Sequence, residues 1–407
     1  MANALAKDLE LMFENVVEGY DAACVLSRAA ETSYPDPQAM QRAGDTFYKK
    51  QNYHAATVSG LDVSGSTRTD VIDRFVPTVF ASPQNVIYEL DAKELRDSAI
   101  MTNMGKAAAQ SLAAEVETTL YAKCAAQASI FVKKVGAISW DDGATAEALM
   151  ISRGINSANR KLFLNPFDYS VIAKDLGNKA YMGDRSKDAY ERSMVPDIAT
   201  FSTFRTDQIA NVTTNGTVSG TTVNANTSHT VTAMTGDLPT DNRYGALVVA
   251  GANIANTVAG AAFTIAGVNA VHMISKADTG QPMTFRIISG QGTANLVISP
   301  KIITSGPYQN VTAQAAAGAA ITFLNNATKP ANVFWAQGAV TLDYGRLAFP
   351  SGTGAQVMTA TTKQGVPIVM VAQINAQTGK VFVRHTTLYA PTVLDPEKVG
   401  VIVANQT

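Results

Sequence analysis

The stretch Asp91–Gln127, DAKELRDSAIMTNMGKAAAQSLAAEVETTLYAKCAAQ, decides the fold. It contains no proline and is rich in alanine, leucine, lysine and glutamate, which have high helix propensity. Asp91 and Glu94 have the spacing of a capping box, so the sequence predicts a helix that begins at Asp91. Apolar residues at steps of four mark one of its faces: Leu112, Val116, Leu120 and Cys124. At about 1.5 Å per residue the helix would be roughly 55 Å long, which predicts a spine running through an extended molecule.

The segment at the N-terminus predicts a second, amphipathic helix. Glu10, Glu14 and Glu18 lie at i, i+4 spacing and form an acidic row on one face. Such a row is either a solvated helix face or a binding surface, and the residues alone leave both readings open. Pro35 and Pro37 end any helix in this region. The apolar stripe on another face consists of Leu5, Leu9, Met12, Val16 and Tyr20.

Between the two helices the sequence predicts extended structure. Thr46–Ser66 is polar, aromatic and punctuated by glycine, which is typical of an extended loop or hairpin without a core of its own. Val71–Leu90 has strand character, with turn-forming residues at Ser82–Asn85.

Two shorter helices are predicted after the long one. The first covers about residues 144–158, and Asp141 and Asp142 are better explained as its start than as a catalytic pair of carboxylates. The second follows Asn165 and Pro166, a good N-cap residue and a proline suited to the first turn, and runs to Leu176.

The composition changes at Asn211. Between Asn211 and Pro330 only five basic and three acidic residues occur, and threonine, asparagine, glycine, alanine and valine dominate. Short strand-like pieces recur at residues 247–249, 263–265, 283–287, 296–298 and 321–323. They predict a compact antiparallel barrel or sandwich, and the contrast with the flanking chain indicates an inserted domain. Tyr244–Ser275 lacks charged residues, but asparagines interrupt it, so no membrane span is predicted.

The last part of the chain is predicted to return to a β-rich domain. Asn332–Leu342 is predicted to be one strand. Val366–Ile374 and Lys380–Leu388 are predicted to pair as a hairpin across Asn375–Gly379.

Charge and cysteine content restrict the function. The 407 residues include 32 basic and 33 acidic ones, a net charge of −1, and only 16% are charged. Sequence-specific DNA binding is disfavoured, because proteins that hold phosphates by charge are normally basic. Two cysteines are too few for a disulfide framework and fit a reducing compartment. Low charge and many small polar residues suit a chain that contacts copies of itself.

The chemistry-bearing residues form no catalytic motif. The histidines, His54, His229, His272 and His385, lack metal-ligand spacing. The sequence contains no P-loop, no complete dinucleotide-binding loop and no hydrolase motif. It therefore predicts no catalytic, cofactor-binding or metal site and a protein that is not an enzyme.

Several short motifs occur in a particular order. They are Ala39–Arg42, Pro83–Asn85 with Leu95–Asp97, Phe163–Pro166 with Asp168–Tyr169, and Asn332–Ala336. In this order and spacing, and with the insertion before the last of them, the chain resembles the coat protein of short-tailed, lambdoid Salmonella-type phages, a branch of the tailed-phage major capsid proteins. The resemblance covers nearly the whole chain and is weakest over residues 177–330.

The resemblance implies an α+β fold, that of tailed-phage and herpesvirus-type major capsid proteins, with a long spine helix, an extended loop and an inserted antiparallel β-barrel domain. The domains it implies are an N-terminal arm (1–44), an extended loop (45–73), a peripheral domain with the spine helix (74–135), a first part of an axial domain (136–210), the β insertion domain (211–330) and the return to the axial and peripheral domains (331–407).

The resemblance also implies a function in assembly. Copies of the chain would form the pentamers and hexamers of an icosahedral procapsid, built in the cytoplasm of a bacterial host with a scaffolding protein and a portal protein. The shell would enclose double-stranded DNA, bound without sequence specificity, and would need no cofactor and no membrane.

Two sets of contact residues are implied in the same way. In this family a basic helical segment of the scaffolding protein binds the N-terminal arm, which implies scaffold contacts at Glu14 and Glu18, with Glu10 extending the row. Between them, where the family has an acid, this chain has Asn15. A loop of the insertion domain reaches the neighbouring capsomer, which implies contacts at Asp237 and Asp241. The residues alone leave open the other reading, that both are solvated turn aspartates. The family's basic cluster on the spine helix, however, is replaced here by Thr102, Asn103 and Met104, so its acid–base pairing with that loop does not carry over.

A function of a different class is the alternative: a non-enzymatic carbohydrate-binding or surface β module on a helical carrier. Such a module would carry clustered aromatic side chains on its β region. The aromatic residues present there are few and include no tryptophan: Tyr244, Phe263, Phe285, Tyr308 and Phe323.

Overall fold

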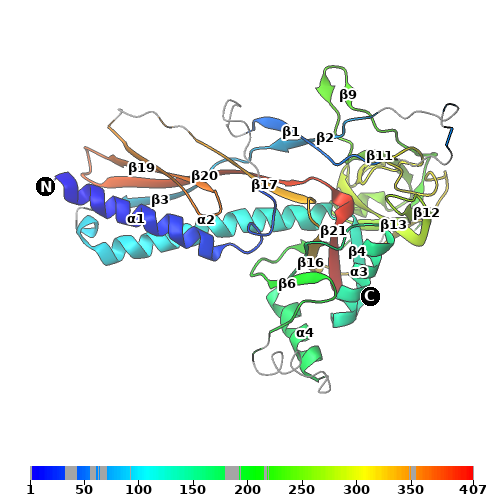
Figure 1. Cartoon of the computed structure of the whole chain (residues 1–407), viewed down its shortest axis with the longest axis horizontal. Helices are drawn as coiled ribbons and strands as arrows, with labels where there is room; N and C mark the ends of the chain where they lie inside the picture. The colour runs from blue at the N-terminus through cyan, green and yellow to red at the C-terminus, as the bar shows by residue number, and fades with distance from the viewer. Residues whose placement is uncertain are drawn as a thin grey trace. The chain divides into compact units, whose positions relative to one another are not determined.

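The structure is a computed structural model that describes residues 2–32, 44–55, 61–62, 64, 71–91, 93–178, 192, 194–214, 218, 220–347, 349 and 354–406 (Figure 1). The chain divides into two compact units, one formed by residues 1–47, 78–120 and 341–392, and the other by residues 48–77, 121–340 and 393–407. Residues 33–43 of the predicted arm, 56–60, 63 and 65–70 of the predicted extended loop, and 179–191 and 193 of the predicted axial domain lie outside the described residues. The predicted domain boundaries stay predictions.

The first unit combines two helices with a five-stranded sheet. The helices are α1 (Ala2–Ala23) and most of α2 (Ser98–Gln127). The strand order is β17-β20-β19-β18, and β3 pairs with β20. The strands are β3 (Gln84–Leu90), β17 (Val340–Gly345), β18 (Gln356–Thr361), β19 (Pro367–Ile374) and β20 (Val381–Val393). The predicted hairpin is confirmed, because Ile374 pairs with Val381 at its closed end.

The long helix is confirmed, but its predicted start is wrong. Glu94 accepts the backbone N–H of Asp91 at 2.9 Å, as in a capping box, yet only the short 3-10 helix η1 (Glu94–Arg96) follows. Asp97 then caps α2 and accepts the backbone N–H of Ala99 at 2.9 Å. With its start at Ser98 the helix is about 45 Å long. All four residues of the predicted apolar face are buried.

The second unit contains a mixed sheet in the order β4-β21-β16-β5-β6, with β7 paired to β16. The strands are β4 (Ile130–Val135), β5 (Arg160–Leu164), β6 (Phe201–Arg205), β7 (Asn211–Val212), β16 (Lys329–Trp335) and β21 (Val399–Gln406). The helices α3 (Trp140–Ser152) and α4 (Pro166–Asn178) share its hydrophobic core. Ser139 and Asp142 form a capping box at α3, and Asn165 caps α4, so both predicted starts have the expected chemistry. The first of these helices was predicted four residues too late at its start and six residues too late at its end.

The five strand-like pieces predicted after Asn211 all belong to one antiparallel sheet. Its order is β15-β12-β13-β14-β11-β8, and a bridge between Thr222 and Ala320 joins its two edges into a nearly closed barrel. The strands are β8 (Thr222–Val223), β11 (Gly245–Ala250), β12 (Ala262–Val271), β13 (Asp278–Ser289), β14 (Asn295–Ser299) and β15 (Ile321–Phe323). Because Val212 pairs with Lys329, both ends of this segment meet on the mixed sheet.

The single strand predicted at Asn332–Leu342 is wrong. Strand β16 ends at Trp335 and β17 begins at Val340. Between them the chain turns at Gly338, whose φ of +75° is one that glycine adopts without strain. Apolar residues lie on both sides of this turn, so the sequence pattern resembled that of one continuous strand. Two further strands, β1 (Thr46–Lys50) and β2 (Phe75–Val79), pair at the base of the predicted extended loop.

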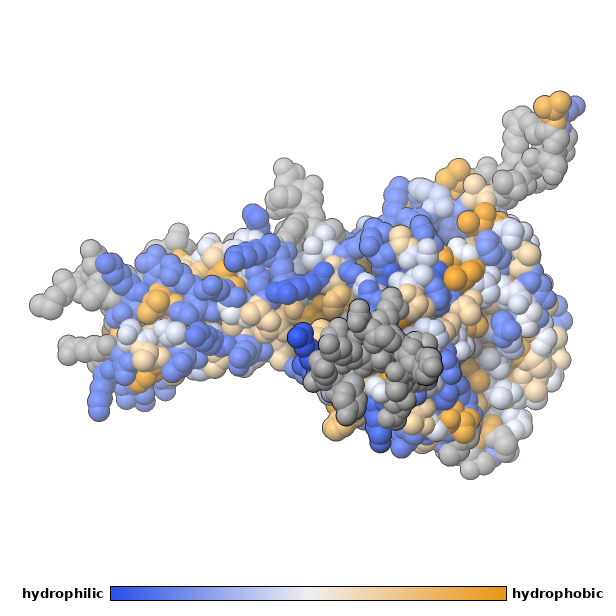
Figure 2. Space-filling model, turned by 60° about the horizontal axis from the view of Figure 1, so that its bottom comes forward, coloured by the Kyte–Doolittle hydropathy of each residue, from blue (hydrophilic) through white to orange (hydrophobic). Residues whose placement is uncertain are grey.

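The surface is mixed in character. On the face drawn in Figure 2, hydrophobic residues form separate small areas among hydrophilic ones. Isolated apolar residues are normal on a protein surface and do not by themselves define an interface. Among the described helices, none has the length and apolar character needed to cross a membrane.

Candidate functional site

The N-terminal helix α1 is held against α2 by its apolar stripe. Leu9, Met12, Val16 and Tyr20 are buried. Gly105 on α2 permits the close approach, because a Cβ atom there would lie 2.5 Å from the carbonyl oxygen of Met12. The predicted stripe is confirmed for these four residues, whereas the side chain of Leu5, its first predicted member, lies outside the described residues. The packing fixes which face of α1 remains outside.

The acidic row lies on that outer face. Glu10, Glu14 and Glu18 are all exposed, and none forms an ion pair with another described residue. The sequence places the acidic row and the apolar stripe on different faces of the helix, and in the structure they lie on different faces. The row presents three carboxylates to solvent.

A buried glutamate fixes the chain directly after α1. The carboxylate of Glu117 on α2 accepts the backbone N–H groups of Leu26 and Ser27 at 2.8 and 2.7 Å. Burial is the main cause that raises the pKa of Glu117. Sequence analysis did not single out this residue. Its position directly after Val116, at the edge of the apolar face of α2, could have indicated that its side chain is buried.

His385 on β20 is a buried titratable group of this unit. Its ring is fully buried, is stacked on Phe13 of α1 with 6.4 Å between ring centroids, and forms no hydrogen bond with a described residue. Burial lowers its pKa from 6.5 to about 4. As the pH falls, His385 therefore binds a proton in the unfolded chain before it does so in the folded chain. The free energy of unfolding decreases as a result between about pH 6.5 and about pH 4.

We expect the substitution His385→Phe to remove this acid sensitivity. The wild-type chain should lose about 2 kcal/mol of unfolding free energy between about pH 7.5 and about pH 5 from this group, whereas the variant should not. Urea unfolding followed by far-ultraviolet circular dichroism at both pH values measures the difference. An equal loss in the two proteins would contradict the assignment.

The second predicted contact lies on a small hairpin. Strands β9 (Met234–Thr235) and β10 (Leu238–Pro239) pair around the two-residue turn Gly236–Asp237. Figure 1 shows this hairpin standing away from the neighbouring barrel strand β11. Asp237 is exposed, and so are the large apolar side chains of Met234 and Leu238, at 53% and 67%.

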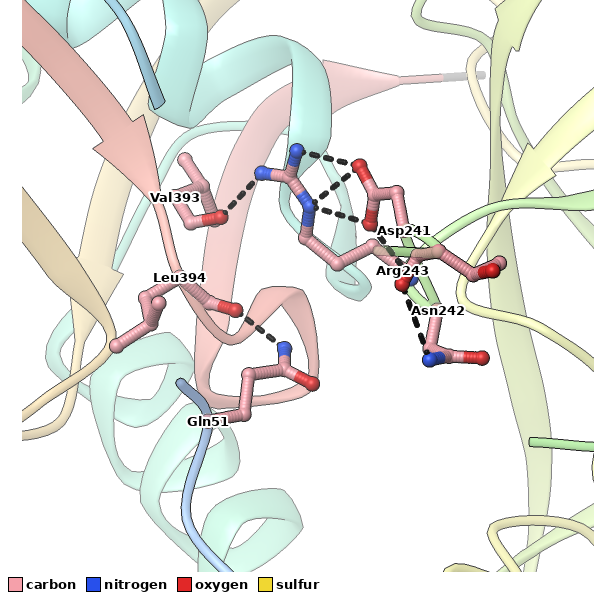
Figure 3. A network of polar contacts seen from close by, with 7 residues as sticks. Gln51, Asp241, Asn242, Arg243, Val393 and Leu394 are labelled. Carbon is pink, nitrogen blue, oxygen red and sulfur yellow. Dashed lines mark hydrogen bonds and ion pairs between the residues drawn. The ribbon is translucent and has the colours of Figure 1, made fainter. Parts of the chain in front are cut away.

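Asp241, by contrast, is engaged within its own chain (Figure 3). Its carboxylate accepts hydrogen bonds from Nε and Nη2 of Arg243, the latter at 2.7 Å. Arg243 is buried and also donates from Nη1 to the carbonyl oxygen of Val393 at 2.7 Å. Beside it, the side-chain amide of Gln51 donates to the carbonyl oxygen of Leu394 at 2.5 Å. The pair Asp241–Arg243 thus fixes the base of the hairpin within the second unit.

The motifs Phe163–Tyr169 and Asn332–Ala336 meet in a buried polar network. The side-chain amides of Asn165 and Asn332 both donate to Oδ2 of Asp168, at 2.7 and 2.6 Å. Oδ1 of Asn332 accepts the backbone N–H of Asn165 at 2.9 Å. All three residues are buried, so the network joins the start of α4 to strand β16.

Strand β13 carries a further contact that sequence analysis did not find. Arg286 is buried and donates from Nη2 to the carbonyl oxygen of Ala125 at 2.5 Å, in the last turn of α2. A cation at a helix C-terminus interacts favourably with the helix dipole and satisfies an otherwise free carbonyl group. Thr284 on the same strand donates to the carbonyl oxygen of Ser129. These contacts connect the barrel to the end of the long helix.

Within the described parts of the chain, no three histidine, cysteine, aspartate or glutamate side chains gather as a metal site requires. Cys24 and Cys124 are free and buried, and burial raises the pKa of both thiols to about 12. A thiol of this kind is protonated at neutral pH and is a poor nucleophile.

A long helix, an attached N-terminal helix with a free acidic face and a nearly closed β barrel inserted into a mixed sheet define a tailed-phage major capsid protein of α+β fold. The family model described as P22 coat protein, gene protein 5, matches residues 1–404. The chain belongs to the P22 coat protein family.

Three solved structures show similarity to this chain. The CUS-3 coat protein I-domain is 40% identical and matches 27% of this chain and 98% of that chain, with a TM-score of 0.22. The capsid of the cyanophage P-SCSP1u is 10% identical over 94% of this chain and 89% of that chain, with a TM-score of 0.46. A chain from Mycobacterium phage Che8 is 8% identical over 88% and 84%, with a TM-score of 0.44.

Membership of this family establishes the protein as a phage coat protein, which forms an icosahedral shell and is a component of the virion. A coat protein is a structural protein and not an enzyme. The alternative of a carbohydrate-binding β module is therefore wrong: the β region is the insertion domain of a capsid subunit.

Proposed function

We propose that this coat protein assembles with a scaffolding protein into a procapsid, and that the acidic row of α1 binds a basic segment of that scaffold. The exposure of Glu10, Glu14 and Glu18, without ion-pair partners among the described residues, is the observation that supports the proposal. Fixed negative charges attract a basic partner at long range and set its orientation.

Exposed ion pairs suit a partner that must later leave the shell. Each is worth about 0–1 kcal/mol and is weakened by salt, because the Debye length falls to about 8 Å at physiological ionic strength. Several weak contacts on many subunits can together hold a scaffold that single contacts release easily.

We expect the double substitution Glu14→Gln with Glu18→Gln to weaken scaffold binding about three- to thirtyfold at low salt, because two pairs of up to about 1 kcal/mol each are lost. Isothermal titration of the purified coat protein with the scaffolding protein of the same phage, at about 50 and about 300 mM NaCl, measures this. The variant should also show a smaller salt dependence.

A matched control is Glu115→Gln, which removes an exposed carboxylate from α2 instead of α1. It should leave the affinity and its salt dependence unchanged. Scaffold binding by the double variant equal to that of the wild type, at both salt concentrations, would refute a role for the acidic row.

We further propose that the hairpin β9–β10 contacts a subunit of the neighbouring capsomer. The exposed Met234, Asp237 and Leu238 support this, because they combine an exposed charge with apolar area. Asp241 contributes by fixing the hairpin base through Arg243, while the side chain of Asp237 at the turn is exposed and pairs with no residue that the structure describes.

The double substitution Met234→Ser with Leu238→Ser should leave the subunit folded, because both side chains are exposed, but should lower the yield of closed shells several-fold. Negative-stain electron microscopy and sedimentation of assembly reactions give that yield. Normal shells in normal yield would argue against a contact at the hairpin.

The proposal also covers the capsomers, the portal protein and the packaged DNA. We propose that copies of the chain form both pentamers and hexamers of the shell, and that one vertex holds a portal protein. The packaged double-stranded DNA is proposed to be held without sequence specificity, which accords with a net charge of −1 and the lack of a strongly basic composition.

A further inference from the structure

Tyr308 of the insertion domain is buried outside the hydrophobic core of the barrel. It belongs to the segment between β14 and β15, and its exposed fraction is only 9%. The barrel core is formed by other side chains, including Phe263 and Phe285. The groups that contact the ring of Tyr308 come from the base of the predicted extended loop. We call this part of the chain the loop base and define it as residues 46–55 and 71–79, which include β1 and β2.

Both halves of the loop base contact this tyrosine. From the first half, the imidazole ring of His54 lies 5.6 Å from the Tyr308 ring, measured between centroids. From the second half, Cζ of Arg74 lies 4.2 Å from the ring centroid, within the range of a cation–π interaction. The hydroxyl group of Tyr308 donates to the carbonyl oxygen of Ile72 at 3.0 Å. The set formed by Tyr308 with His54, Ile72 and Arg74 is named the tyrosine clamp.

The charges of the tyrosine clamp are compatible with close packing. Burial, and then the charge of Arg74, lower the pKa of His54 to about 4, so the ring is neutral at neutral pH and does not repel the guanidinium group. Arg74 also donates from Nη2 to the carbonyl oxygen of Asn52 at 2.8 Å. The same side chain therefore joins the two halves of the loop base and holds them against Tyr308.

Tyr308 is held in a fixed position on the barrel side. The turn that carries it is closed by Asn310, whose side-chain oxygen accepts the backbone N–H of Ile303 at 3.0 Å and whose backbone N–H donates to the carbonyl oxygen of Ile303 at 3.1 Å. The side-chain amide of Asn310 donates to the carbonyl oxygen of Lys301 at 2.7 Å and to Oε1 of Glu397 at 2.8 Å. Asn310 is itself buried. A side chain on a turn fixed in this way can orient the chain that packs against it.

Two contacts attach the loop base to the same unit at other points. The side chain of Gln51 is buried and donates to the carbonyl oxygen of Leu394 (Figure 3). Phe75 forms a parallel β bridge with Asp241, next to the hairpin β9–β10. Two of the residues that hold the loop base, Tyr308 and Asp241, therefore belong to the insertion domain.

We propose that the insertion domain orients the extended loop of the coat subunit before assembly, and that the tyrosine clamp is the main contact by which it does so. An extended loop that is not held at its base can adopt many orientations, and fixing one of them in the unassembled subunit reduces the entropy that is lost on association. Tyr308 is a positioning residue in this role, because it acts through the loop base and not by contact with another subunit.

Hydrogen–deuterium exchange of the unassembled subunit, followed by mass spectrometry, tests the tyrosine clamp. Tyr308→Ala should raise the exchange rate of backbone amides in the loop base more than about tenfold, because local opening no longer breaks the contacts of the ring. The rates in β12 and β13 should stay as in the wild type, since Tyr308 is not part of the barrel core. Ser305→Ala, the matched control, removes an exposed hydroxyl group from the same segment and should change neither region.

Two milder variants cover the case in which Tyr308→Ala does not fold, as judged by its circular dichroism. Tyr308→Phe keeps the ring but loses the hydrogen bond to Ile72, and should raise exchange in the loop base about two- to fivefold. His54→Ala removes the ring on the side of the loop base and should raise exchange there about three- to tenfold. Neither variant should change exchange in β12 and β13.

An assembly reaction connects the orientation of the loop base to function, and this part of the inference rests on the proposed function. With the scaffolding protein of the same phage, Tyr308→Ala should form closed shells several-fold more slowly than the wild type, as followed by light scattering. If the wild-type subunit does not assemble with the scaffolding protein, the proposed function fails, whereas the exchange data alone decide whether the tyrosine clamp orients the loop base.

Three results would overturn the inference. The first is exchange of the loop base at the wild-type rate in the variants of Tyr308 and His54. The second is an equal rise of exchange in β12 and β13, which would show a general loss of barrel stability. The third is assembly at the wild-type rate by a variant whose loop base exchanges faster.

Discussion

Replacing Gly400 with alanine is expected to destabilise the second unit by about 3 kcal/mol or more. Gly400 pairs with Phe334 across strands β21 and β16, and the aromatic ring lies over the glycine. A Cβ atom at Gly400 would overlap Cζ, Cε1 and Cε2 of that ring. Phe334 is fully buried and its ring also packs edge-on against Phe201, so a shift of the ring would disturb a second buried contact.

The two tryptophans of the chain are suitable fluorescent probes for this measurement. Both tryptophans belong to the second unit: Trp140 packs against the hydrophobic core, and Trp335 is buried and stacked on Phe163. Urea unfolding followed by tryptophan fluorescence should therefore give the stability of the region around Gly400. A loss below about 1 kcal/mol would contradict the packing described here.

A double-mutant cycle tests the named contact. Phe334→Leu removes the ring edge that a new methyl group would strike, although it leaves a cavity of its own. If the clash with Phe334 causes the loss, Gly400→Ala should cost much less in the Phe334→Leu background than in the wild type. Equal costs in the two backgrounds would show that another contact is responsible.

The second large effect is expected at Asp168. Asp168→Ala leaves the side-chain amides of Asn165 and Asn332 without their shared acceptor in a buried site. Each buried donor without a partner costs about 1–3 kcal/mol, so the expected loss is about 3 kcal/mol in the same fluorescence assay. The affected residues join α4 to β16 and lie in two motifs by which the chain resembles its family.

Asp168→Asn is the matched control. Both amides donate to the same oxygen, Oδ2, and the side-chain oxygen of an asparagine can occupy that position. The variant loses the charge in the first turn of α4, which is worth about 0.3–1 kcal/mol at a helix N-terminus. We therefore expect a loss of at most about 1 kcal/mol. A loss as large as that of the alanine variant would show that the charge, and not the acceptor, holds this site.

Local patterns made much of this fold predictable. The steps of four in α2 and the separate stripe and acidic row of α1 follow from helix geometry, and the side chains described lie as that geometry requires. The N-cap of α4 at Asn165 and the five barrel strands were also visible, because caps and short strands have signals within a few residues.

Features that depend on distant residues were not predictable. The start of α2 was misplaced because both Asp91 and Asp97 can cap a helix, and sequence alone does not choose between them. The turn at Gly338 was not predicted because apolar residues flank it on both sides. Those residues belong to two strands, β16 and β17, of different sheets.

The contacts of the candidate site residues were likewise not predictable from the sequence. Asp237 and Asp241 look equivalent in sequence, yet only the folded chain reveals that Arg243 engages Asp241. The partner of Glu117 is the backbone of residues about 90 positions earlier, and backbone groups leave no mark in a sequence. The pocket that α1 forms with β18 likewise brings together residues more than 300 positions apart in the chain.

The most direct test of the proposed assembly is an electron cryomicroscopy map of shells assembled from the purified coat protein and the scaffolding protein of the same phage. The account predicts closed shells in which α1 faces the interior and scaffold density lies on Glu14 and Glu18. Shells in which a neighbouring coat subunit covers these glutamates, or in which they face the outside, would contradict it.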